Sequence, residues 1–297
     1  MKRLIVIVGA TGSGKTDASI RLARKLGAPI ISTDSRQIYR GIPIGTAQPT
    51  AEQLAAAEHH FIATHELTEN FSCGQFEVQA LALLEKLFTR CDNVVAAGGS
   101  GLYIKALCEG MDDLPATDDR LRATLNERMR NEGIGSLLAD LQRLDPEYYL
   151  QVDRDNPSRV LRAVEVCMQT GRPYSSMRTG QRRKRDFEII KIGIDMERET
   201  LYDRINRRVD QMIADGLEEE ARKVYPLKHL NSLQTVGYRE MFDWFDGLTD
   251  RETAIELIKR NSRRYAKRQL TWFRRDSEII WIKPEEILSA VEKTVHQ

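Results

Sequence analysis

The first hundred residues alternate short apolar runs with helical patterns. The runs at 4–8, 29–32 and 93–97 are short and mostly apolar, as in buried strands. A glycine-rich segment, GATGSGKT at 9–16, follows the first run and opens a helix that we expect to end near Leu26, before Gly27. The alternation predicts an α/β fold in which helices flank a parallel sheet.

A block of helical patterns interrupts this alternation. Residues 118–171 read as three helices separated by glycine and proline, and strand character returns only at 188–194. A helical block within a sheet indicates an insertion. We therefore expect an inserted helical domain at 113–185 and a core domain made of 1–112 and 186–297.

Composition excludes several classes of protein. The chain has 297 residues, of which 41% are hydrophobic and 30% charged, with a net charge of +1, so we expect one or two folded domains. No apolar run approaches the roughly 20 residues of a membrane-spanning helix, so we expect no membrane segment. The four cysteines lie far apart without a C-x-x-C pair, which argues against disulfides and zinc. This pattern fits a reducing compartment, and we expect a cytoplasmic protein.

Residues 9–16 match the Walker A pattern G-x-x-x-x-G-K-[ST] in the strand-to-helix context that the motif requires. The glycines allow backbone N–H groups to converge on phosphate oxygens at a helix N-terminus. Lys15 adds a point charge, and the Thr16 hydroxyl can bind magnesium. The motif predicts a P-loop NTPase-like sheet. Taken alone, it favours ATP as the ligand and a small-molecule or nucleoside kinase as the function.

Two features weaken the kinase interpretation. Enzymes of that class usually carry an acidic residue after a second apolar strand, where this chain has only glycines and Ser100. Asp195, at the end of a later apolar run, could substitute, but nothing in the sequence places it near the loop. Asp34 follows the strand after the P-loop helix, at the sheet edge where ligands of open α/β sheets bind. The alternative role for Asp34 is to form a turn or cap a helix.

Basic residues gather in two segments although the net charge is small. Segment 259–275 holds eight lysines and arginines, interleaved with aromatic residues, and no acidic residue, and 178–185 holds a second run. A solvated basic face is the ordinary explanation, whereas a polyphosphate or nucleic-acid partner explains the missing acids better. Arg204, Arg207 and Arg208 could likewise be surface charges or hold a phosphate. The histidines at 59, 60 and 65 lack companions at metal-ligand spacing, so we expect them to be structural.

Six segments together resemble one family. They are GATGSGKT, DSRQIYRGIPIGTAQP from Asp34, GGSGLY, NPSRVLRAVEV, TVGYRE and KRQLTWFR. In this order, over nearly the whole chain, they resemble the bacterial tRNA dimethylallyltransferase family, the tRNA isopentenyltransferases, which modify an adenine beside the anticodon. The chain departs from the family pattern at Ala10, Gln48 and Ser100, where proline, lysine and threonine are common. Gln48 puts any charged contact at that position in doubt.

The resemblance implies the substrates and the residues that bind them. A dimethylallyl group would pass from dimethylallyl diphosphate to the exocyclic amine of an adenine next to the anticodon in tRNA, with Mg²⁺ as the cofactor. Asp34 would be the general base, and Lys15, Thr16 and Arg208 would act on the diphosphate. The diphosphate-binding loop would consist of Gly9, Ala10, Thr11, Gly12, Ser13, Gly14, Lys15 and Thr16. Contacts with the tRNA anticodon stem-loop would come from Asp34, Ser35, Arg36, Gln37, Ser100, Arg122, Ser158, Arg159, Val160, Leu161, Arg162, Gln234, Thr235, Val236, Gly237, Tyr238, Arg239, Lys267, Arg268, Gln269, Leu270, Thr271, Trp272, Phe273 and Arg274.

The candidate residues suit this chemistry. An adenine exocyclic amine is a weak nucleophile because its lone pair is delocalised into the ring, so attack on an allylic carbon needs assistance at both ends. Lys15, the loop amides, magnesium on Thr16 and Arg208 can stabilise the leaving diphosphate, while Asp34 can accept the amine proton. The adenine must leave its stack, which suits an RNA loop with splayed bases. A P-loop kinase stays open as the alternative enzyme and a non-catalytic RNA-binding module as a third interpretation. We expect a monomer.

Overall fold

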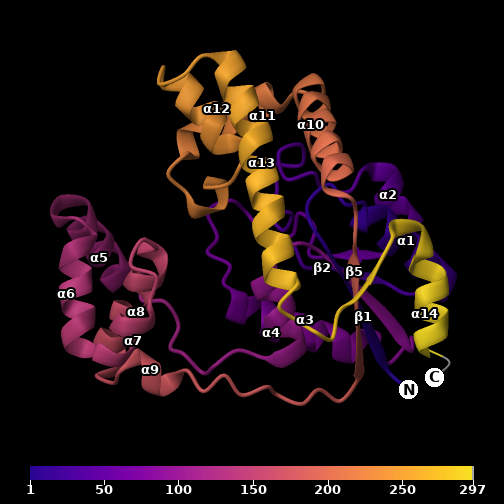
Figure 1. Cartoon of the computed structure of the whole chain (residues 1–297), viewed down its shortest axis with the longest axis horizontal. Coiled ribbons are helices and arrows are strands. Elements are labelled where there is room, and N and C mark those ends of the chain that lie inside the picture. Colours follow the sequence, from indigo (N-terminus) through magenta and orange to yellow (C-terminus); the bar gives the residue numbers. More distant parts are fainter. Residues whose placement is uncertain (296–297) are drawn as a thin grey trace. The chain divides into compact units, whose positions relative to one another are not determined.

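The computed structural model describes residues 1–295 of the chain and divides it into two compact units. The core unit contains Met1–Cys108 and the chain from Lys184 onward, and the helical unit is Glu109–Arg183 (Figure 1). The insertion expected from the sequence spans 113–185. Among the described residues, no helix has both the length and the apolar character needed to cross a membrane.

The core unit contains a parallel sheet whose described strands follow the order β3-β2-β4-β1-β5-β6. The strands are β1 (Arg3–Val8), β2 (Ile30–Ser32), β3 (His59–His60), β4 (Asn93–Ala97), β5 (Glu188–Ile194) and β6 (Ile280–Ile282). This confirms the parallel α/β fold. The sequence did not predict β3 and β6, because two- and three-residue edge strands are too short to leave an apolar pattern.

Helices cover both faces of the sheet. Those of the core unit are α1 (Lys15–Leu26), α2 (Ala51–Ala56), α3 (Cys73–Leu87), α4 (Gly101–Glu109), α10 (Arg198–Ala214), α11 (Leu217–Val224), α12 (Tyr238–Phe245), α13 (Arg251–Phe273) and α14 (Ile287–Val295). Because successive strand residues point to opposite faces, Leu4 packs in one core cluster with Phe76 of α3 and Leu107 of α4. Ile5 packs in a second cluster with Leu22 of α1. Residues 4–8 of β1 are therefore all buried, as their continuous apolar run indicated.

Three strands end at the same edge of the sheet. Ile7 of β1 and Ser32 of β2 are both in register with Ala97 of β4. The chain leaves these strands into the P-loop, into the segment that begins with Asp34, and into the turn at Gly98. Parallel pairing therefore brings three segments that are far apart in the sequence to one place.

The helical unit has a core of its own. Its helices are α5 (Asp119–Glu132), α6 (Ile134–Leu144), α7 (Pro146–Gln151), α8 (Pro157–Thr170) and α9 (Tyr174–Met177). Leu137 and Leu141 of α6 are buried in one cluster with Val160 and Val164 of α8. The side chain of Asn156 accepts a hydrogen bond from the Arg159 amide at 3.2 Å, which caps α8 ahead of the proline at its first position.

Candidate active site

The glycine-rich loop joins β1 to α1 at the carboxyl edge of the sheet. Gly14 precedes α1 with a φ of 89°, a left-handed conformation that side chains resist, so glycine is needed where the loop enters the helix. The first amides of α1 have no acceptor within the helix and are free to bind an anion. The loop members that line the adjoining cavity are Thr11, Gly12, Gly14, Lys15 and Thr16. Gly9, Ala10 and Ser13 are buried and are not among the residues that line the cavity, and their part in diphosphate binding stays a prediction.

A cavity of about 360 Å³ lies beside the P-loop and is formed entirely within the core unit. Its walls come from the loop, the segment after β2, residues 46–49, the turn after β4, and the helices α10 and α13. Ligand pockets of proteins typically start at roughly 300 Å³, so the cavity is large enough for a small diphosphate ester.

Charged side chains of both signs line this cavity, among them Lys15, Arg208 and Asp34. Lys15 Nζ donates to the carbonyl of Ala10 at 2.6 Å, and Arg208 Nη1 donates to the Thr11 hydroxyl at 3.2 Å. Burial lowers the pKa of Lys15 to about 8, with Asp34 opposing the shift and Arg208 adding to it. Burial also lowers the pKa of Arg208, again opposed by Asp34. A bound anion would favour the charged forms of both cations.

Asp34 has one carboxylate oxygen engaged and one available. Its Oδ1 accepts hydrogen bonds from the amides of Arg36 at 2.9 Å and Gln37 at 3.3 Å, which is the turn-forming role. Its Oδ2 makes no hydrogen bond with any residue in the described range 1–295, and Asp34 lines the cavity. The two roles are therefore compatible, because the turn fixes a carboxylate that still has a free oxygen.

The turn after β4 packs tightly against the Asp34 segment. Ser100 Oγ accepts from the Ser35 amide at 2.9 Å and donates to Ser35 Oγ at 3.1 Å. A Cβ at Gly98 would lie 2.4 Å from the Thr33 hydroxyl, so only glycine allows this approach. The motifs beginning at Asp34 and Gly98 thus form one surface next to the P-loop.

A buried carboxylate that the sequence did not predict holds the loop of the GTAQP motif. Glu220 of α11, 7% exposed, accepts from the amides of Ile44 at 2.9 Å and Gly45 at 2.8 Å, and from the Tyr238 hydroxyl. A Cβ at Gly45 would come within 2.5 Å of the Tyr238 ring. Glu220 lies in an acidic run, EEE, that reads as a solvated surface, so no signal in the sequence distinguished it.

Gln48 has a definite role in this loop. Its Nε2 donates to the carbonyls of Gln37 at 2.9 Å and Tyr39 at 2.7 Å. The neutral amide therefore braces the backbone of two cavity-lining segments, although the residue carries no charge.

Tyr265 of α13 is an unexpected member of the site. It lines the cavity, and burial, followed by the charge of Asp34, raises its pKa to about 12. The sequence showed Tyr265 only as one aromatic residue within a basic helix. Folding places its ring beside the candidate base.

The segments expected to contact tRNA mix exposed and buried side chains. The buried members, all 6% exposed or less, are Val160, Leu161, Tyr238, Gln269 and Phe273, and Gly237 is buried as well. These side chains pack largely beneath the surface, Gln269 also lines the cavity, and their contact with tRNA stays a prediction. The exposed members are Ser158, Arg159, Gln234, Arg239, Lys267, Arg268, Thr271, Trp272 and Arg274. The half-buried members are Ser35, Arg36, Gln37, Ser100, Arg122, Arg162, Thr235, Val236 and Leu270.

In the helical unit, a buried carboxylate positions two of the expected RNA-contacting arginines. Glu165 is fully buried, and its Oε2 accepts from Arg122 at 2.6 Å and Arg162 at 2.8 Å. Arg162 also donates to the carbonyl of Pro115 at 2.5 Å. Both guanidinium groups are therefore fixed before any ligand arrives.

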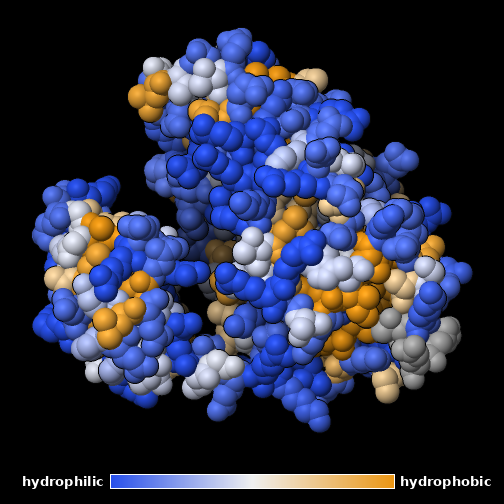
Figure 2. All heavy atoms as spheres, viewed as in Figure 1, coloured by the Kyte–Doolittle hydropathy of each residue, from blue (hydrophilic) through white to orange (hydrophobic). Residues whose placement is uncertain are grey.

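The basic helix α13 carries unpaired charge along its exposed side. Arg260, Arg264, Lys267 and Arg268 are exposed, and none pairs with a carboxylate within residues 1–295. Hydrophilic residues cover much of the surface along α13 in Figure 2. Lys259, by contrast, pairs with Asp210 at 2.8 Å. Exposed cations without acidic partners are typical of a surface that binds phosphates.

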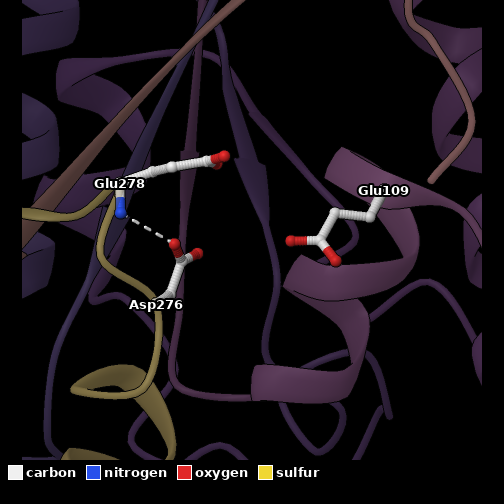
Figure 3. A group of neighbouring side chains, drawn as sticks. All are labelled: Glu109, Asp276 and Glu278. Atoms are coloured by element: carbon white, nitrogen blue, oxygen red, sulfur yellow. Dashed lines mark hydrogen bonds between the residues drawn. The ribbon is translucent and has the colours of Figure 1, made fainter.

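Two acids near the end of α13 have a structural role. Asp276 and Glu278 accept from Lys191 Nζ at 2.7 and 2.8 Å. Figure 3 shows the further hydrogen bond that the Glu278 amide donates to Asp276 at 3.0 Å. Glu109, also drawn in Figure 3, belongs to the helical unit. Because both carboxylates pair with the nearly buried Lys191 ammonium, we assign them to an ion-pair network.

Comparison with known proteins agrees with this geometry. The IPP transferase family model matches residues 37–276. The tRNA dimethylallyltransferase 1 of Phocaeicola vulgatus is 50% identical over 296 residues, 99% of each chain, and the tRNA dimethylallyltransferase 2 of Parabacteroides distasonis is 49% identical over 286 residues, 96% of each chain. The full-length tRNA isopentenylpyrophosphate transferase of Bacillus halodurans is 38% identical with a TM-score of 0.72, covering 100% of this chain and 96% of its own. A eukaryotic dimethylallyltransferase acting on tRNA shares the fold, with 24% identity, a TM-score of 0.80, and coverage of 96% of this chain and 74% of the other. The chain therefore belongs to the IPP transferase family.

Proposed function

We propose that this protein transfers the dimethylallyl group of dimethylallyl diphosphate to the exocyclic amine of an adenine beside the anticodon of tRNA. One observation carries the proposal: a single cavity brings the P-loop, with Lys15 and Arg208, next to a carboxylate oxygen of Asp34 that has no partner among the described residues. An acceptor for a proton and a cradle for a leaving diphosphate are the two requirements of prenyl transfer to an amine.

The charged groups of the cavity and Tyr265 each have a part in this reaction. Lys15, Arg208 and the free amides at the start of α1 bind the diphosphate and stabilise the charge that grows on it as the allylic C–O bond breaks. Asp34 Oδ2 accepts the proton that the amine loses as the new C–N bond forms. Tyr265 offers an aromatic face beside Asp34 for an adenine that has left its stack.

Magnesium is the cofactor that we propose for the cavity. The hydroxyl of Thr16 lines it, and a hard oxygen ligand together with substrate phosphates is the donor set that Mg²⁺ prefers, which leaves Asp34 free to act as the base. The residues present therefore fit the ion, which would neutralise diphosphate charge when bound. Asp195, the other acid considered, pairs with Arg274 at 2.9 Å and is not among the residues lining the cavity.

The tRNA would bind to basic surfaces of both units. In the core unit these are the exposed cations of α13 and Arg239, and in the helical unit they are Arg122, Arg159 and Arg162. The relatives reported above are named transferases, and a kinase would leave this RNA-binding charge without a purpose. These observations favour tRNA over a small hydroxylated acceptor.

Mass spectrometry of tRNA nucleosides tests the proposal. Unmodified tRNA is incubated with the protein, magnesium and dimethylallyl diphosphate, then digested. We expect an adenosine heavier by one dimethylallyl group in exchange for one proton, together with equimolar diphosphate. Turnover of ATP that depends on a small acceptor, with unchanged tRNA, would replace the proposal by the kinase interpretation.

A further inference from the structure

Gln269 of α13 uses both ends of its side-chain amide inside the protein. It is 6% exposed; its Oε1 accepts from the Thr11 amide of the P-loop at 2.8 Å, and its Nε2 donates to the Gly99 carbonyl at 2.9 Å. Glutamine combines one acceptor and one two-proton donor, which this pair of backbone partners requires. Gln269 therefore links α13 to the phosphate loop and to the turn after β4.

The fit around this amide leaves no room for adjustment. A Cβ at Gly99 would lie 2.1 Å from Gln269 Nε2, so the amide rests directly on the backbone of the turn. The Thr11 hydroxyl also accepts from Arg208 of α10 at 3.2 Å. The first cavity-lining residue of the P-loop is thus held from two sides, by α13 through its amide and by α10 through its hydroxyl.

The part of α13 that contains Gln269 also carries exposed basic side chains. Lys267 and Arg268 directly precede Gln269 and are exposed, whereas Gln269 points into the protein. If the helix moves as a rigid element, an RNA bound to Lys267 and Arg268 would also act on the position of the Gln269 amide. Gln269 is therefore a buried link between the P-loop and the proposed RNA-binding surface.

We propose that Gln269 is a positioning residue that fixes the Thr11 amide in the diphosphate cradle and couples tRNA binding on α13 to diphosphate binding in the P-loop. The inference rests on the proposed function for the identity of the two ligands. By linkage, a coupling that strengthens diphosphate binding in the presence of RNA strengthens RNA binding by the same factor, and such couplings typically amount to about 5- to 150-fold.

The test measures binding of inorganic diphosphate by calorimetry, with magnesium, in the absence and presence of an anticodon stem-loop RNA. The variant Gln269→Met keeps the length of the side chain and removes both hydrogen bonds. We expect its diphosphate affinity to fall about 10-fold or more, the influence of RNA on that affinity to disappear, and RNA affinity without diphosphate to stay within about 2-fold. Gln211→Met is the matched control and should behave as the wild type. Gln211 of α10 is exposed, and among residues 1–295 its side chain bonds only to Asp215, at the C-terminal end of the same helix.

A second variant distinguishes the loss of the two hydrogen bonds from a folding defect of Gln269→Met. Gly99→Ala leaves Gln269 in place and pushes its amide away from the turn, so it should weaken diphosphate binding in the same direction. Unchanged diphosphate affinity in a folded Gln269→Met protein overturns the positioning role, as does loss of RNA affinity alone, which would make Gln269 a direct RNA contact. Equal diphosphate affinity of the wild type with and without RNA overturns the coupling. If the wild type binds diphosphate but leaves tRNA unmodified, the proposed function fails while the Gln269 measurements still stand.

Discussion

Replacement of Asp34 by asparagine separates its role in the turn after β2 from its proposed role as the general base. Asparagine keeps an Oδ1 atom that can accept the hydrogen bonds from the amides of Arg36 and Gln37, so the turn after β2 should persist. The atom at the Oδ2 position becomes an NH₂ group, which cannot accept a proton. The substitution therefore removes the proposed base at nearly constant shape.

The expected loss follows from the size of general-base effects. Such a contribution is typically about 100- to 10,000-fold, so Asp34→Asn should lower the rate of the chemical step by that factor, or about 3 to 5 kcal/mol. The lost carboxylate also stops raising the pKa of Lys15, which lies at about 8 in the wild type. We therefore choose pH 7, where a bound diphosphate keeps Lys15 charged and the change in rate reports on the base.

Single-turnover kinetics with saturating donor measure this rate directly, and tRNA affinity is measured in parallel. Asp17→Asn is the matched control, because Asp17 lines the same cavity but is exposed and bonded to Gln53 at 3.0 Å. We expect a small effect there and tRNA affinity within a few-fold of wild type for both variants. A near-normal rate for Asp34→Asn would remove Asp34 from the mechanism. Lost tRNA binding with a normal chemical step would instead make it a recognition residue.

Three further predictions concern the surroundings of the site. Replacing Lys267 and Arg268 by alanine should reduce the salt dependence of tRNA affinity by about one unit of log–log slope for each RNA phosphate that the protein no longer neutralises; an unchanged slope would identify a merely solvated face. Donor affinity should be highest below the Lys15 pKa of about 8 and decline as the pH rises through it, because the charged amine binds the diphosphate, and calorimetry of Lys15→Arg should show that decline abolished. Tyr238→Phe removes the hydroxyl on buried Glu220 but keeps the ring, so urea unfolding should show a loss of about 1 to 3 kcal/mol, with a raised KM for the donor because the loop at residues 44–45 loosens. Wild-type values of both quantities would contradict this role of the hydroxyl.

The sequence by itself determined the elements whose physical causes are local. The apolar run before GATGSGKT predicted β1, the run at β4 was located to the residue, and Gly27 marked the end of α1 at Leu26. The Walker A pattern located the phosphate cradle because its chemistry comes from consecutive backbone amides. The position of Asp34 beside the cavity could be predicted because residues that follow a parallel strand lie at the ligand-binding edge of the sheet.

Only the tertiary structure decided which polar side chains make hydrogen bonds inside the protein. Tyr238 and Gln269 read as members of RNA-contacting motifs, but packing turns both inward, onto Glu220 and onto the Thr11 amide. Glu220 reads as one acid of a solvated run until folding brings the loop at residues 44–45 to it. The helical period shows which residues share a face but not which partner that face meets, because these hydrogen bonds join residues 18 to 258 positions apart. Which distant residues meet depends on the whole fold, so only the three-dimensional structure shows these contacts.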